Sequence, residues 1–146
     1  MNRFRHQRRP SRPPFDQRGQ SLTEMAIFIT LLMLVLAGVI DLGRAYYSYL
    51  SLKDAAAEGA AYGSIAPDDL GGIEARVRGE SPDGLIDWSG AAVETSFIGP
   101  ACRGGGVRVE VTIIYTFLTP FIGSIAGTQS IPLSADVVNT ILSPEC

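Results

Sequence analysis

Histidine and cysteine are scarce in this chain of 146 residues, which has one histidine, His6, and two cysteines, Cys102 and Cys146. A Ser-His-Asp triad needs a histidine held in a fold, and His6 lies in an arginine- and proline-rich start that cannot bury a core. Two cysteines without a histidine nearby do not make a zinc site. The glycines at 104–106 precede neither a lysine nor a helix, so they do not form a phosphate-binding loop. The sequence therefore predicts a protein that is no enzyme and has no cofactor.

Acidic residues are nearly missing from positions 1–19, where Asp16 is accompanied by six arginines: Arg3, Arg5, Arg8, Arg9, Arg12 and Arg18. The rest of the chain has the opposite balance, with six basic and fourteen acidic residues out of totals of 12 and 15. This acidic body argues against nucleic acid as a partner, because phosphate contacts need a surplus of lysine and arginine. The basic start could be a nucleic-acid-binding arm or the cytoplasmic flank of a membrane segment. The apolar run that begins at residue 25 favours the flank.

Charge is absent from residues 25–40, MAIFITLLMLVLAGVI. Extending this run to about 22–43 gives roughly the 20 residues that a membrane-spanning helix needs. The extension includes Glu24 and Asp41, which lie about 25 Å apart along a helix and so near opposite edges of a hydrocarbon core about 30 Å thick. Asp41 can form an interfacial ion pair with Arg44, one turn further on. We therefore expect a single-pass helix with its N-terminus in the cytoplasm.

The apolar run has two weaker interpretations. It could be the core helix of a soluble protein, but no remaining part of the chain is large enough to surround it. It could be a secretory signal peptide, but no A-x-A cleavage pattern lies after it.

The helix should continue well beyond the membrane, because proline is absent from residues 21–62 and alanine, the best helix former, is frequent up to residue 61. An apolar stripe is expected on one face, at Tyr49, Leu50, Leu52, Ala56 and Ala60. The helix should end at Gly63, before Ser64 and Pro67, because glycine and proline are typical helix terminators.

The stretch RGQSLTE, residues 18–24, places a glutamate at the start of the apolar run. Taken alone, Glu24 could be a solvated interfacial side chain or an acid that stabilises the first turn of a helix. A basic leader, Gly19, a glutamate five positions later and an apolar helix together resemble a type IV prepilin. If a peptidase cuts between Gly19 and Gln20, Glu24 becomes the fifth residue of the mature chain and lies about 6 Å from the new amine along the helix axis.

Residues 18–62 resemble more closely the TadE-like family of pseudopilins from tight-adherence (Tad/Flp) pilus systems. The resemblance rests on Arg18-Gly19, Glu24, the apolar run, the DLGR segment at 41–44 and the alanine-rich stretch at 55–61. It implies a minor pilin or assembly factor that acts with a prepilin peptidase, other pilins and pseudopilins, an inner-membrane platform and a secretion ATPase. It also implies processing at Gly19 and Gln20, and a subunit-register role for Glu24.

Residues 64–146 read as a small extracytoplasmic α+β domain. A short helix is expected over Leu70, Ile73 and Val77, ending near Gly79. Strand candidates are 91–98, 107–117 and 131–141, of which 107–117 alternates most clearly between apolar and polar residues. Turn residues occupy 81–84, and glycines 104–106 suit a hairpin loop. The apolar connector at 119–123 could tuck beneath the sheet or face another subunit or the bilayer.

Cys102 and Cys146 both fall on the side predicted to be outside the cell membrane, where a disulfide can persist. It would be worth about 3–4 kcal/mol in the chain-entropy model; the alternative is two free thiols. Acidic residues gather at Asp68, Asp69, Glu74, Glu80, Asp83 and Asp87. They are either a solvated surface or a weak calcium site.

The sequence thus predicts an α+β, pilin-like protein in three parts. Residues 1–19 are a basic leader, 20–63 a long helix with a transmembrane first half, and 64–146 a small antiparallel sheet domain outside the membrane. The predicted location is the bacterial inner membrane, with incorporation into a pilus as a further step. The competing hypothesis is an uncleaved single-pass anchor whose outer domain binds a ligand or acts as a scaffold. A cleaved, secreted domain is a third.

Overall fold

The protein was analysed as a computed structural model, which describes residues 17–79 and 86–146. The leader up to residue 16, the turn expected at 81–84 and the acids Glu80 and Asp83 lie outside the described residues. The chain divides into two compact units, the first ending at Leu36 and the second beginning at Ala37.

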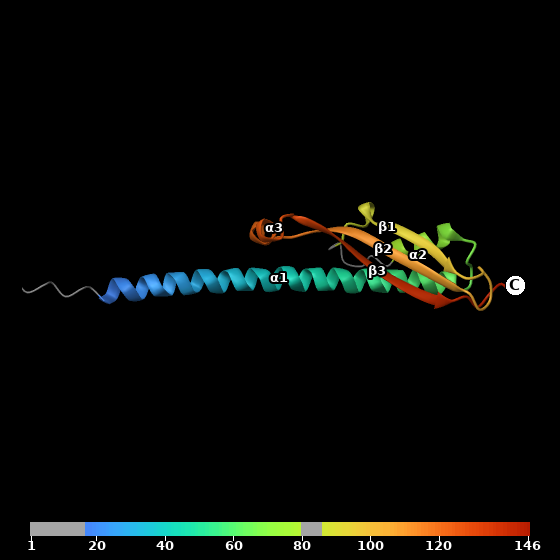
Figure 1. The fold of residues 1–146 in the computed structure, drawn as a ribbon, viewed down its shortest axis with the longest axis horizontal. Coiled ribbons are helices and arrows are strands. Elements are labelled where there is room, and N and C mark those ends of the chain that lie inside the picture. The colour runs from blue at the N-terminus through green and yellow to red at the C-terminus, as the bar shows by residue number, and fades with distance from the viewer. Residues whose placement is uncertain (1–16, 80–85) are drawn as a thin grey trace, which may run out of the picture. The chain divides into compact units, whose positions relative to one another are not determined.

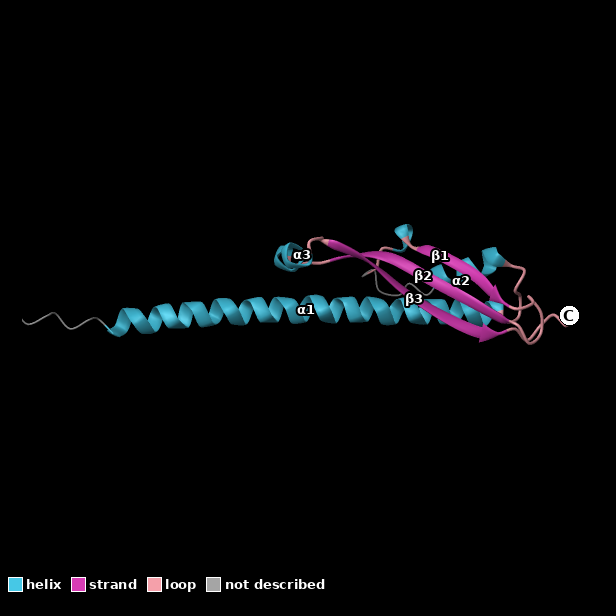
Figure 2. Cartoon of the chain, in the orientation of Figure 1, coloured by secondary structure: helices cyan, strands magenta, loops and turns pink. Residues whose placement is uncertain are grey.

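One long helix and a small sheet dominate the structure (Figures 1 and 2). Helix α1 (Gln17–Gly63) runs from the first unit into the second and is followed by α2 (Leu70–Gly79), the 3-10 helix η1 (Trp88–Gly90), β1 (Ala92–Ile98), β2 (Gly106–Thr116), α3 (Pro120–Ala126) and β3 (Ser130–Thr140). The strands form an antiparallel sheet in the order β1-β2-β3. The predicted α+β class, a long N-terminal helix followed by a three-stranded antiparallel sheet, is confirmed.

The central strand β2 carries the core of the sheet. Its alternate residues are buried, as the sequence pattern predicted: Val107, Val109, Val111, Ile113 and Tyr115. Phe117, expected at the end of the same strand, lies just beyond it, because β2 ends at Thr116. The buried face of the sheet packs with the C-terminal half of α1 and with α2, whose Ile73 and Val77 belong to the same core.

The face of α1 that contacts this core consists mostly of small residues. Leu52, Ala56 and Ala60 are buried as predicted, together with Ala55. The expected places of Tyr49 and Leu50 in the stripe were wrong: these side chains are 38% and 39% exposed. The physical reason is the phase of the helix: at about 100° per residue, Leu50 lies roughly opposite Leu52, and Tyr49 lies at the edge of the buried face. Further along the same face the packing is close, since a Cβ atom at Gly59 would lie 2.5 Å from Val77 Cγ2.

The apolar connector after β2 is the short helix α3, which was not predicted from the sequence. Thr119 is its N-cap, Pro120 occupies the first turn, and Gly127 ends it in the left-handed conformation with φ 76°. These are typical start and stop residues, since proline suits the first helical position and glycine the position after the last.

Candidate functional site

The predicted processing site lies inside α1, near its start. Gln20 Nε2 donates a hydrogen bond to Glu24 Oε1 at 3.2 Å, and Thr23 Oγ1 donates to the carbonyl oxygen of Gly19 at 3.0 Å. Gly19, Gln20 and Glu24 are all exposed. The structure therefore brings Gln20 and Glu24 together on one turn of the helix and leaves the carboxylate at the surface.

The apolar run after Glu24 has no covering layer among the described residues. In the most apolar 18-residue window of the helix, only 6% of the residues are buried, whereas the core helix of a soluble protein would be mostly buried. Within the described part of the chain, α1 is the one helix that is long and apolar enough to cross a membrane. This is consistent with a single-pass membrane anchor.

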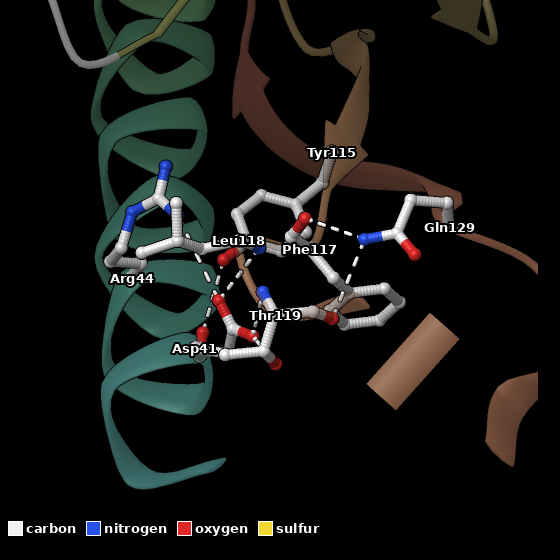
Figure 3. A network of polar contacts seen from close by, with 7 residues as sticks. All are labelled: Asp41, Arg44, Tyr115, Phe117, Leu118, Thr119 and Gln129. Carbon is white, nitrogen blue, oxygen red and sulfur yellow. Dashed lines mark hydrogen bonds and ion pairs between the residues drawn. The ribbon is translucent and has the colours of Figure 1, made fainter. Parts of the chain in front are cut away.

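Asp41, directly after the apolar run, is the centre of a polar cluster (Figure 3). Its side chain is buried, with 1% exposure. Oδ1 accepts a hydrogen bond from the Leu118 N–H at 2.9 Å, and Oδ2 accepts from both the N–H (3.0 Å) and the hydroxyl (2.5 Å) of Thr119. The Tyr115 hydroxyl donates to the Asp41 carbonyl oxygen at 3.0 Å. Three donors thus surround the carboxylate, which is how a buried charge is tolerated.

Arg44 contributes less to this cluster than the sequence suggested. Its Nη1 lies 3.8 Å from Asp41 Oδ1, close to the outer limit of an ion pair, and its guanidinium lies 6.0 Å from the centre of the Tyr115 ring. The much shorter bonds from Leu118 and Thr119 define where Asp41 points. Sequence reasoning missed Thr119, because a partner 78 positions away leaves no local pattern around either residue.

Gln129 joins the two ends of the segment that contains α3, through hydrogen bonds to Phe117 (Figure 3). Its side-chain amide donates to the Phe117 carbonyl oxygen at 2.8 Å, and the Phe117 N–H donates to the Gln129 carbonyl oxygen at 3.0 Å. The Tyr115 and Phe117 rings meet edge to face, 5.7 Å apart. Together with Asp41, these contacts fix the beginning and the end of the α3 segment.

At the far end of the sheet, Cys102 and Cys146 form a disulfide. Nearby, Arg103 pairs with Glu145 at 2.8 Å, and the Leu142 N–H donates to the carbonyl oxygen of Ser64 at 2.7 Å. The C-terminal tail is therefore tied both to the β1–β2 loop and to the end of α1.

Three of the described acids in the predicted cluster have local structural partners, and the first of them, Glu74, accepts a hydrogen bond from Arg78 Nε at 2.9 Å. Asp69 accepts hydrogen bonds from the Tyr62 hydroxyl at 2.7 Å and from the Gly72 N–H at 2.9 Å, and these bonds hold the pKa of its carboxyl below the usual value. Asp87 accepts from the hydroxyl and the N–H of Ser89, which lowers the pKa of Asp87 in the same way. Within residues 17–79 and 86–146, no three acidic, histidine or cysteine side chains come together in a way that could hold a metal ion.

An apolar helix that continues into a three-stranded antiparallel sheet defines a pilin-like α+β protein. Residues 19–61 match the family model of TadE-like protein, which confirms the resemblance drawn from the sequence, so this part of α1 is a TadE-like domain. No curated protein and no solved structure matches the chain significantly. A TadE-like domain in this part of the chain suggests an association with the Tad pilus machinery.

Proposed function

We propose that this protein is a non-catalytic minor pilin or pseudopilin needed to assemble a Tad-type pilus. The observation that carries the proposal is the TadE-like helix itself, in which RGQSLTE leads directly into an exposed apolar run. The protein inserts into the bacterial inner membrane through residues 22–43, with the basic leader in the cytoplasm and the sheet domain outside. Its partners are a prepilin peptidase, other pilins, the membrane platform and the secretion ATPase.

The chemistry of assembly depends on a cut between Gly19 and Gln20. This cut creates an ammonium group at Gln20, about 6 Å along the helix from Glu24. In an apolar surrounding, an amine and a carboxylate attract strongly, and each is costly to bury alone. In a bundle of such helices, Glu24 of one copy neutralises the new terminus of a neighbour. The charge pair sets the register of an interface that is otherwise apolar and non-directional.

The second candidate function is an uncleaved membrane anchor with a ligand-binding or scaffold domain outside. One observation favours it: α1 begins at Gln17, so the bond between Gly19 and Gln20 lies in helical backbone, whereas proteolysis prefers exposed, irregular segments. In that case Glu24 serves only as a polar residue at the membrane edge, paired with Gln20 of its own chain.

Substitution of Glu24 tests the proposal in cells. Glu24→Ala and Glu24→Gln should leave the protein in the membrane fraction but lower its incorporation into pili at least about tenfold, the effect of about 1.4 kcal/mol of lost pairing. Glu58→Ala, which removes an exposed acid from the second half of the same helix, is the matched control and should assemble normally. Normal piliation in both Glu24 variants would remove the pairing mechanism and favour the uncleaved anchor.

A further inference from the structure

One long stretch of the sheet domain contains no charged side chain. Residues 111–135 contain no Asp, Glu, Lys, Arg or His, and they form the second half of β2, all of α3 and the first half of β3. We call this segment the hairpin tip. Figure 1 shows α3 at the end of the sheet opposite the C-terminus. Charged pairs lie outside the segment, for example Arg103 with Glu145 and Arg108 with Asp136. The hairpin tip therefore carries no charge of its own, and the charged side chains that lie against it, Asp41, Arg44 and Asp87, come from other segments.

The hairpin tip exposes large apolar side chains. Leu118 is 63% exposed and Ile114 is 66% exposed. Ile114 pairs with Pro132 on the open face of the sheet, so this cross-strand pair is apolar. Backbone groups at the base of α3 are already paired through Phe117 and Gln129. Removing Leu118 and Ile114 from water is favourable because their side chains are apolar, and the backbone at the base of α3 is already hydrogen-bonded. The exposed polar side chains of the tip, such as Ser124 and Thr128, carry no charge.

Asp41 places this segment at the border of the apolar run of α1. Asp41 follows Ile40, the last residue of that run, and its carboxylate holds the backbone N–H groups of Leu118 and Thr119 (Figure 3). Helix α3 begins at the next residue, Pro120, and has seven residues, a length of about 10 Å. The whole of α3 therefore stays within about 10–15 Å of the point where α1 leaves the hydrocarbon.

We propose that the hairpin tip is a second, peripheral membrane contact, with Leu118 and α3 inserted at the boundary between headgroups and acyl chains on the outer side. The inference rests on the proposed function, because it requires α1 to span the membrane. A lipid surface is the occupant that fits. The segment is charge-free, it exposes apolar side chains, and it is tied to α1 where the apolar run ends. Asp41 then acts as a positioning residue that sets how the sheet domain stands on the bilayer.

Fluorescence quenching by brominated lipid tests this contact in the full chain. The protein is reconstituted into two sets of phosphatidylcholine vesicles, one with bromine close to the headgroup to probe positions 118 and 142, and one with bromine deep in the acyl chains to probe position 34. Trp88, the sole tryptophan, is replaced in Trp88→Phe, and a new tryptophan is introduced as Leu118→Trp. Leu142→Trp, at a similarly exposed leucine in the C-terminal tail, is the control outside the membrane, and Leu34→Trp is the control inside it. If Trp88→Phe does not fold, the same variants are read as differences from the protein that retains Trp88.

The expected result is quenching of Leu118→Trp by about twofold or more, with Leu142→Trp unchanged, since an interfacial segment lies about 5–10 Å into this boundary. Quenching of Leu34→Trp without quenching of Leu118→Trp would overturn the peripheral contact and leave the membrane anchor intact. Absence of quenching at Leu34→Trp would refute the anchor and the contact together. Protection of Leu118→Trp from both bromine and a water-soluble quencher would also overturn the proposal, because a second protein copy would then cover the tip.

Discussion

Helix α1 presents two different surfaces along its length. Up to residue 36 its large apolar side chains are exposed, whereas from residue 37 onward the face that meets the sheet and α2 is lined mostly with small, buried residues. The second part has its packing partners within the chain. The first part has none among the described residues and must find them outside, in lipid or in other subunits. One continuous helix thus contains a segment that packs within its own chain and a segment for which we propose membrane insertion and assembly.

The two acids that border the apolar run differ in the same way. Asp41 is buried and receives three hydrogen bonds from residues 118 and 119. Glu24 is exposed and receives a hydrogen bond from Gln20 on its own helix. A carboxylate that is satisfied inside its own chain stabilises the fold. A carboxylate at the surface retains capacity for another donor and is suited to an intermolecular role, which is the role we propose for Glu24.

The largest effect on stability is expected from Asp41. Asp41→Ala leaves the N–H groups of Leu118 and Thr119 without an acceptor. It should lower the free energy of unfolding of the sheet domain by about 3 kcal/mol. Denaturant unfolding of the full chain in detergent, followed by Trp88 fluorescence, measures this change. Asp54→Ala, at an exposed acid on the same helix, is the control and should change stability by less than about 0.5 kcal/mol. Equal effects of the two variants would mean that the comparison between buried and exposed acids is wrong.

A smaller effect is expected from glycine substitutions in α1. Gly59→Ala places a methyl group 2.5 Å from Val77 Cγ2 and should destabilise the domain by about 2 kcal/mol through overpacking. Gly43→Ala meets no atom within 4 Å and should be neutral, or stabilising by about 0.5–1 kcal/mol, because alanine favours the helix. The same unfolding assay separates them. A Gly59→Ala protein as stable as Gly43→Ala would show that the close approach of α1 and α2 is not required.

The smallest effect concerns pH. The Tyr62 hydroxyl and then the Gly72 N–H hold the pKa of Asp69 below its ordinary 3.8. The folded protein therefore gains stability from this carboxylate above about pH 4, and loses it as pH falls through the lowered pKa. The Asp69→Asn protein should lose less stability than the unmodified protein between about pH 4 and pH 2. Parallel stability curves for the two proteins over this range would exclude a contribution from Asp69.

Much of the fold could be predicted from the sequence because it rests on periodic patterns. The alternation in β2 identified its buried face, and the long proline-free stretch identified α1. The choice of Leu50 and Tyr49 as core residues failed, because it counted hydrophobicity and ignored helix phase, which puts Leu50 roughly opposite Leu52 and Tyr49 at the edge of the buried face. At Gly59 and Ala60 the close packing of the core selects the smallest side chains over the most apolar ones.

The candidate site likewise has one part that the sequence predicts and one part that depends on the tertiary fold. Gly19, Gln20 and Glu24 are close in sequence, so their arrangement near one helical turn follows from helix geometry alone. The hydrogen bonds between Asp41 and Thr119 depend on how the sheet meets α1, and no pattern in the sequence encodes that contact. Helix α3 could have been found, because Thr119-Pro120 is a start signal and Gly127 a stop signal.

The central claim is that a cut at Gly19 creates a charged amine for Glu24, and the mass of the N-terminal peptide tests it most directly. The protein is purified from cell membranes and sheared pili, digested and analysed by mass spectrometry. We predict an N-terminal peptide that begins at Gln20 with an unblocked amine. A peptide that retains the leader from Met1 would contradict the account. So would a terminal Gln20 that has cyclised to pyroglutamate, because such a chain has no ammonium group to pair with Glu24.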